Sequence, residues 1–288
     1  MEQRIRFGPA GNSESFYDEG HDSTVETPKW LHERGLDAFE YSFGRGVRLG
    51  ADKAKEIALE AEKYDVQLSV HLPYFINLAA QEAEKKQKNI GYFLDSLVIA
   101  RALKAPRAVF HPGSASGGSR RDILDRAKLF FREILSVIDE HGFGDITLCA
   151  ETMGKINQLG SLDEVIELVN VDERVLPTID FGHLHTRGLG AINGREDYEA
   201  ILDALENGIG HERTARMHVH FSRIEFTKGG EKMHHTFKDT QYGPDFAPLG
   251  RLIAERGYRP VLICESKGTM AEDAAQMRKM YTDSINSL

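Results

Sequence analysis

The chain has 288 residues, of which 41% are hydrophobic and 28% are charged, as in an ordinary soluble globular protein. Its formal net charge of −9 excludes a surface that is basic throughout, although a local basic groove stays compatible with it. The two cysteines, Cys149 and Cys264, lie far apart in apolar segments, so we expect reduced thiols. The N-terminus lacks an apolar signal region, and no segment approaches ~18 apolar residues. We therefore expect a cytoplasmic protein that makes no membrane contact.

Eight short apolar segments are predicted to be strands, and most of them alternate with amphipathic helices. The predicted strands cover residues 4–9, 36–43, 66–73, 108–112, 146–152, 175–180, 216–221 and 260–264. The predicted helices cover residues 27–34, 51–64, 81–103, 119–142, 161–169, 195–207, 246–256 and 270–281. This alternation predicts a (β/α)8 barrel, a TIM barrel, in the α/β class. Because no linker or repeat divides the chain, we expect one domain over residues 1–288.

A long polar segment, residues 223–245, follows the seventh predicted strand. Loops of this length inside compact domains usually have a function, as lids or as binding loops. We expect it to form a loop at the metal site.

Six of the eight predicted strands carry residues that can bind metal at or near their C-terminal ends. These residues are His71, His111, Glu151, Asp180, the pair His218 and His220, and Glu265. In a (β/α)8 barrel these strand ends meet at one rim, where reactive groups project. A single strand-end His or Glu is more often a hydrogen-bonded structural residue. Six at one rim favour a metal centre, because carboxylates that share a cavity repel one another unless cations lie between them.

The donor set combines imidazole and carboxylate groups without a thiolate. It favours Zn²⁺, Mn²⁺ or Fe²⁺ over Mg²⁺ or Ca²⁺, which prefer oxygen ligands alone. The donors outnumber what one tetrahedral site can use, so we expect two or three ions, with Glu151 or Asp180 as a bridge. Clustered ions are typical of phosphodiester hydrolysis, because they stabilise the attacking and the leaving oxygen together.

Several motifs resemble the endonuclease IV family, zinc-dependent apurinic/apyrimidinic endonucleases with a (β/α)8 barrel. The resemblance covers about residues 36–265. It is carried by His71-Leu72-Pro73-Tyr74-Phe75-Ile76-Asn77-Leu78, Phe110-His111-Pro112-Gly113-Ser114, Glu151-Thr152-Met153-Gly154, Ile179-Asp180-Phe181-Gly182-His183 and Met217-His218. The resemblance implies hydrolysis at abasic sites, with damaged double-stranded DNA as the partner. We expect the protein to act as a monomer.

The resemblance also implies roles for individual residues. The first of three zinc ions would be held by His71, His111 and Glu151, and the second by Glu151, Asp180, a strand-seven histidine and Glu265. His183 would hold the third zinc with a pair of residues from the long loop. Glu151 would be the catalytic residue that activates the attacking water. Tyr74 would enter the DNA around the flipped sugar, and Arg45, with Arg48, would correspond loosely to a DNA-inserting loop.

The chain departs from the family pattern in two places. His218-Val219-His220-Phe221 stands where the family has His-x-Asn-Asp, and two residues apart on a strand both imidazoles face the same side, so either could be the ligand. Glu231 and His234, with Glu-x-x-His spacing, replace an Asp-x-His pair.

Two other functions compete with DNA cleavage. A metal-dependent sugar isomerase or epimerase on the same barrel would use similar ligands, and a barrel could bind metal or nucleic acid without catalysis. Eight basic residues near the rim suffice for a local DNA groove: Arg45, Arg48, Arg120, Arg121, Arg187, Arg223, Lys228 and Lys232. We expect Cys149 to be a buried core residue, and His185 and His235 to face solvent.

Overall fold

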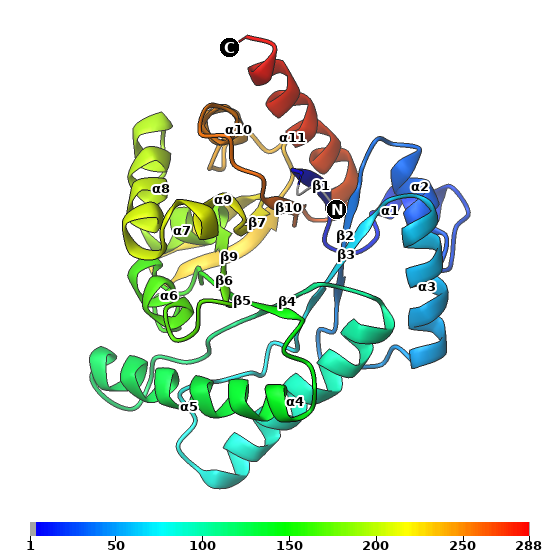
Figure 1. The fold of residues 1–288 in the computed structure, drawn as a ribbon. Coiled ribbons are helices and arrows are strands. Elements are labelled where there is room, and N and C mark those ends of the chain that lie inside the picture. Colours follow the sequence, from blue (N-terminus) through cyan, green and yellow to red (C-terminus); the bar gives the residue numbers. More distant parts are fainter. Residues whose placement is uncertain (1–3, 288) are drawn as a thin grey trace.

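The computed structural model describes residues 4–287. Eight parallel strands form a barrel with the helices around its outside (Figure 1). The strands are β1 (Arg6–Pro9), β2 (Ala38–Ser42), β3 (Gln67–His71), β4 (Arg107–Phe110), β5 (Thr147–Glu151), β6 (Leu176–Asp180), β7 (His218–Phe221) and β10 (Val261–Cys264). Their order is β1-β10-β7-β6-β5-β4-β3-β2. The amide of Asp37 donates to the Phe7 carbonyl at 3.0 Å, and that of Gly11 to the Glu40 carbonyl at 3.0 Å. These bonds join β2 to β1, and the predicted (β/α)8 barrel is confirmed.

The helices follow the strands around the ring, and each predicted helix overlaps an observed one. They are α1 (Glu14–Asp18), α2 (Thr27–His32), α3 (Ala51–Lys63), α4 (Ala83–Ala102), α5 (Arg120–Glu140), α6 (Leu162–Val169), α7 (Phe181–Arg187), α8 (Arg195–Ile209), α9 (His211–Ala215), α10 (Phe246–Glu255) and α11 (Met270–Ile285). None of the helices within residues 4–287 is both long and apolar enough to cross a membrane.

The main hydrophobic core lies between the barrel and the helices. Helix α5 shows why: Ile123, Ala127, Phe130 and Ile134 recur at helical spacing and are all buried. Inside the barrel the apolar clusters are small, such as Val109, Cys149 and Leu176. Cys149 is therefore a buried core residue, as predicted.

Three short helices, α1, α7 and α9, do not appear among the predicted elements. Helix α7 starts directly after β6, where the sequence indicates only a strand end followed by a glycine-rich loop. The Asp180 side chain caps it by accepting the His183 amide at 2.6 Å. With seven residues, including Gly182, this helix is too short to show a helical period in the sequence.

The segment predicted as a long loop, residues 223–245, is largely a β-hairpin. Strands β8 (Arg223–Thr227) and β9 (Gly230–His235) pair in antiparallel fashion, with an irregularity between Glu225 and Phe226. The hairpin lies beside the loop after β5, because the Glu231 amide donates to the Gly154 carbonyl at 3.2 Å. Its strands are short, polar and interrupted by the bulge, so a period-two pattern does not stand out in the sequence.

Gly230 holds the tip of this hairpin in a conformation that favours glycine. Its φ is +93°, and an added Cβ would lie 2.1 Å from the Gly154 carbonyl oxygen. We expect Gly230→Ala to cost about 1–3 kcal/mol of local stability and to expose β9 to protease. Gly229→Ala is the matched control, since its Cβ would meet nothing closer than Thr227 Oγ1 at 3.8 Å. Limited proteolysis that cuts both variants equally would contradict this role.

Candidate metal centre

The C-terminal ends of the strands bring the predicted donors to one end of the barrel. His71, Glu151 and Asp180 are the last residues of β3, β5 and β6, and His111 and Glu265 directly follow β4 and β10. A cavity of about 360 Å³ opens there. Its lining includes His71, His111, Glu151, His183, Glu231, His234 and Glu265, with Tyr74, Lys155 and Gln158 further out.

The buried carboxylate of Glu151 is the centre of the cluster. His71 Nε2 lies 3.0 Å and His111 Nε2 lies 3.1 Å from its Oε2. On the other side, His183 Nδ1 and His220 Nδ1 lie 3.2 Å and 3.3 Å from Oε1. Each carboxylate oxygen therefore faces two imidazole nitrogens. This is the arrangement that a carboxylate needs if it is to bridge two cations.

The pKa shifts around Glu151 indicate that its buried carboxylate is stabilised by positive charge. Burial would raise the pKa of the Glu151 carboxyl, but its interactions with the imidazoles of His111 and His220 hold that pKa well below its usual range. Burial would likewise lower the pKa of His71, yet the hydrogen bond to Glu151 raises it to about 9. For His111 burial prevails and the pKa falls. Protons on imidazoles thus occupy the positions in which metal ions could neutralise the same carboxylate.

A second group lies on the Oε1 side of Glu151. Donor atoms of Glu151, Asp180, His220 and Glu265 all lie within 4.8 Å of one another. Asp180 Oδ2 is buried and has no hydrogen-bond partner among residues 4–287. A buried carboxylate oxygen without a partner is costly, and a cation would satisfy it. The donor set of this group therefore fits a bound metal.

The hairpin supplies a third group. Glu231 Oε2 lies 3.5 Å from His183 Nε2, and Glu231 Oε1 lies 3.9 Å from His234 Nε2. His183, His234 and Glu265 also have donor atoms within 4.8 Å of one another. Ser222, which the sequence does not single out, fixes the His234 ring through a 2.8 Å hydrogen bond to Nδ1. Glu231 and His234 thus stand beside His183, as the resemblance implies.

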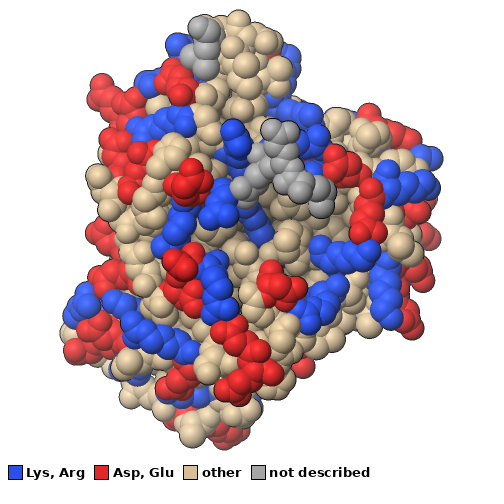
Figure 2. Space-filling view, viewed as in Figure 1, with Lys and Arg blue, Asp and Glu red and all other residues tan. Residues whose placement is uncertain are grey.

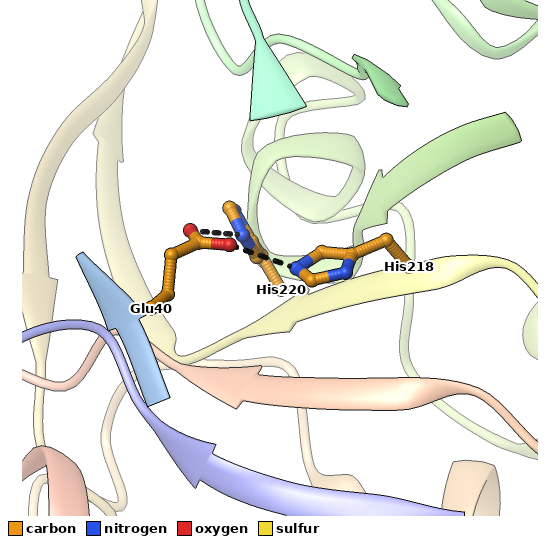
Figure 3. A group of neighbouring side chains, drawn as sticks. All are labelled: Glu40, His218 and His220. Atoms are coloured by element: carbon orange, nitrogen blue, oxygen red, sulfur yellow. Dashed lines mark hydrogen bonds and ion pairs between the residues drawn. The ribbon is translucent and has the colours of Figure 1, made fainter. Parts of the chain in front are cut away.

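Glu40 is a buried part of the site that sequence reasoning missed. It lies in β2 and faces the two histidines of β7 (Figure 3). Its Oε2 accepts a hydrogen bond from Ser69 Oγ at 2.8 Å and lies 3.0 Å from His218 Nε2. Its Oε1 lies 2.9 Å from His220 Nε2, although the angle is poor for a hydrogen bond. The sequence signal that could have identified Glu40 is an acidic residue inside an otherwise apolar strand.

The two histidines of β7 differ in the acidic residues that they contact. His220 turns Nε2 toward Glu40 and Nδ1 toward Glu151 and Glu265, the latter at 3.5 Å. His218 lies deeper, and its only acidic neighbour among the described residues is Glu40. Burial lowers the pKa of His218 to about 4, so it is neutral. The structure therefore brings His220, and not His218, to the cluster.

The two candidates for substrate binding differ in their position relative to the cavity. Tyr74 lines the cavity and is 52% exposed, whereas Arg45 is exposed but outside the lining. The prediction that His185 faces solvent was wrong: it is 6% exposed, and its Nδ1 accepts the Ile192 amide at 3.2 Å. His235 is partly buried in β9 and stacks on Tyr242 at 4.0 Å.

Half of the predicted basic rim is neutralised by neighbouring carboxylates. The pairs are Arg120 with Glu164, Arg121 with Glu167, Arg223 with Asp245 and Lys232 with Glu225. Arg187 donates instead to the carbonyls of Met153, Lys155 and Gln158. Within residues 4–287, Arg45, Arg48 and Lys228 have no carboxylate within ion-pair distance. The rim therefore offers less free positive charge than the sequence indicates.

The family model described as xylose isomerase-like TIM barrel matches residues 28–283. The chain belongs to this family. It is 31% identical over 277 residues to an uncharacterized protein of Methanocaldococcus jannaschii, covering 96% of this chain and 97% of that protein. It is also 28% identical to a probable endonuclease 4 of Aquifex aeolicus, over 74% of this chain and 77% of that protein.

Two solved structures share the fold. A D-tagatose 3-epimerase-like protein superposes with a TM-score of 0.74 and 21% identity, over 98% of this chain and 99% of that one. Endonuclease IV from Thermus thermophilus superposes with a TM-score of 0.67 and 18% identity, over 99% of this chain and 100% of that one. The same barrel thus serves a nuclease and a sugar-epimerase-like protein.

The contact between Glu40 and His220 gives a testable prediction. If the cluster binds a divalent metal ion and Glu40 orients His220 toward it, Glu40→Gln should weaken retention of added Zn²⁺ by about 10–100-fold, as loss of a partner of a metal ligand typically does. Competition with a chromogenic chelator measures this. Glu164→Gln is the control, because Glu164 is also buried but pairs with Arg120 and caps α6. Equal zinc affinity in the Glu40→Gln variant and the wild-type protein would refute the orienting role.

Proposed function

We propose that this protein is a zinc-dependent endonuclease IV-like phosphodiesterase that cleaves DNA at apurinic/apyrimidinic sites. The observation that carries the proposal is the shared carboxylate of Glu151, which faces two imidazoles on each oxygen. Such a bridge suits adjacent metal ions, the usual device for phosphodiester hydrolysis. The curated relatives named probable endonuclease 4 support this assignment.

Three ligand groups follow from the contacts. His71, His111 and Glu151 Oε2 would hold one ion, and Glu151 Oε1, Asp180, His220 and Glu265 a second. His183, Glu231 and His234 would hold a third. The mixed nitrogen and oxygen donors suit Zn²⁺, and Mn²⁺ or Fe²⁺ could replace it at some positions. When bound, these ions would polarise the phosphate and lower the pKa of a coordinated water.

The residues of the chain contribute position and charge. Glu151 is ionised at neutral pH, because its pKa lies well below the usual range, so it can accept a hydrogen bond from the attacking water. Glu40, which accepts a hydrogen bond from Ser69, lies against the ring of His220. Because these groups are buried and mutually bonded, little reorganisation is needed when negative charge develops on the phosphate.

The rim has one feature suited to an extrahelical nucleotide. Tyr74 and Phe75 are exposed large aromatic residues with ring centroids 4.5 Å apart, and Tyr74 borders the cavity. Aromatic rings in this position can stack on a base or fill the gap left by a flipped sugar. Lys155, Arg45, Arg48 and Lys228 provide the positive charge that remains for the phosphate backbone.

A second candidate function is a metal-dependent sugar isomerase or epimerase. The observation in its favour is the pairing of rim cations with carboxylates, since DNA affinity depends strongly on free Lys and Arg. A cavity of about 360 Å³ also suits a monosaccharide. Metal-loaded protein that interconverts ketohexoses but leaves an abasic duplex intact would replace the proposal with this one.

The first test concerns the bridge. Glu151→Gln should fold normally but lose nicking of an abasic duplex, because an amide cannot bridge two cations or take a proton from water. Circular dichroism checks the fold and gel electrophoresis follows the nicking. Glu164→Gln should keep most of the activity. Near-native nicking by the Glu151→Gln variant would show that the bridge is misassigned.

The second test concerns the third ion. Replacing Glu231 and His234 together by alanine should remove about one zinc equivalent and lower cleavage more than DNA binding. The reason is that this ion would stabilise charge that develops mainly in the transition state. Elemental analysis and single-turnover assays measure the two effects. A double variant with full zinc content and full activity would leave a two-metal site. Glu225→Ala with Lys232→Ala, an ion pair on the same hairpin, is the control.

A further inference from the structure

We propose that the opposite end of the barrel holds a binding pocket for a nucleoside phosphate. A cavity of about 660 Å³ opens there, beside the start of β1. Its basic lining residues are Arg4, Arg6, Lys104, Arg107, Arg216 and Arg259. Figure 2 shows several Lys and Arg side chains near the middle of this face, with Asp and Glu side chains among them. This site is independent of the proposed nuclease function.

The strand order explains why the arginines converge. Arg6 and Arg107 are the first residues of β1 and β4, and Arg216 and Arg259 each precede the neighbouring strands β7 and β10 by two residues. Because the N-terminal ends of parallel strands meet at one end of the barrel, these side chains surround the same opening. The Arg259 amide donates to the Ala215 carbonyl at 2.7 Å, which places the backbone of Arg259 beside that of Arg216.

The charges of three of these arginines are not neutralised by the part of the chain that the structure describes. Arg4 and Arg6 pair with Asp65, and Lys104 pairs with Glu62. Over residues 4–287, no carboxylate lies within ion-pair distance of Arg107, Arg216 or Arg259.

Arg107 shows that this unbalanced charge is partly enclosed. It is 6% exposed and spans the barrel floor from β4, donating to the carbonyls of Met217 at 3.2 Å and Arg216 at 2.9 Å. Burial lowers the pKa of Arg107, and the nearby charge of Arg216 lowers it further. Like charges held together at the edge of a low-dielectric interior favour an anion between or beside them.

An adjoining hollow extends the positive region. It shares Thr147, Leu176 and Arg216 with the first cavity and adds Arg213, together with Glu173 and with Arg174, which pairs with Asp139 and Asp172. Arg213 donates to the carbonyls of Val169 and Val175, and its buried Nε has no hydrogen-bond partner among the described residues. The arginines therefore form a track rather than a single point, which suits a ligand with more than one phosphate group.

The residues that line the cavity indicate which kind of ligand it can bind. Guanidinium groups bind phosphate oxygens in bidentate fashion, so phosphates are the favoured anions. The lining also includes the apolar residues Ala58, Ala61, Leu103 and Pro106, of which the first three are almost fully buried. A volume of about 660 Å³ falls in the range of small-ligand pockets. A nucleoside di- or triphosphate would place its phosphates on the arginines and its base against the apolar residues.

The test uses the full-length, zinc-loaded protein. Isothermal titration with adenosine, adenosine diphosphate, adenosine triphosphate and inorganic pyrophosphate should give binding for the two nucleotides, weaker binding for pyrophosphate, and none for adenosine. Arg216→Gln combined with Arg259→Gln should weaken nucleotide binding about 10-fold or more, as expected when two charge-assisted phosphate contacts are lost, without changing the zinc content. Both side chains reach solvent, so this variant should fold.

An arginine outside the pocket provides the control variant. Arg121→Gln, which removes an arginine paired with Glu167 on α6, should leave nucleotide affinity unchanged. Unchanged affinity in the Arg216/Arg259 variant, or no nucleotide binding at millimolar concentration, would overturn the proposal. Pyrophosphate binding as tight as that of the nucleotides would overturn the role of the apolar residues.

Discussion

The structure of the candidate site depends on one buried carboxylate that four imidazoles share. Glu151 lies at the end of β5 with two histidine nitrogens near each oxygen, and Asp180 and Glu265 bring further negative charge close by. Burying such a set would be prohibitive without compensating cations, whether protons or metal ions. The fold solves part of this problem by placing each donor at the end of a different strand, so that the barrel fixes their separation.

The polar cluster continues below the rim, into the barrel. Glu40, Ser69 and His218 form a buried layer beneath His220 and Glu151, and Arg107 spans the floor. The small apolar clusters inside the barrel cannot offset the desolvation of these groups. The larger hydrophobic core between the strands and helices must therefore supply most of the stability. The barrel interior can therefore hold charged and hydrogen-bonded groups without being the main source of stability.

The fold and most donors could be predicted from the sequence, because strand periodicity and strand-end residues are local signals. His71, His111 and Asp180 each directly end or follow an apolar run. Glu40 could not be found in this way, since its partners, Ser69 and His218, lie 29 and 178 residues away along the chain. The hairpin β8–β9 differs from the predicted loop for a related reason: its order comes from contacts with Gly154 and α7, not from its own apolar pattern.

Charge pairing at the rim also limits what the site can bind. A nuclease needs free cations along the phosphate backbone, yet Arg120, Arg121, Arg223 and Lys232 pair with carboxylates of the chain. Three other unpaired arginines, Arg107, Arg216 and Arg259, lie at the far end of the barrel. Unpaired arginines thus lie where the strands begin, and the candidate metal-binding donors lie where the strands end. A long-range field from the arginine end would add little at the rim, because solvent screens exposed charges beyond about 8 Å at physiological salt. A substrate at the candidate metal centre would therefore depend on any metal that the donors hold, on Tyr74 and on the few free cations beside the cavity.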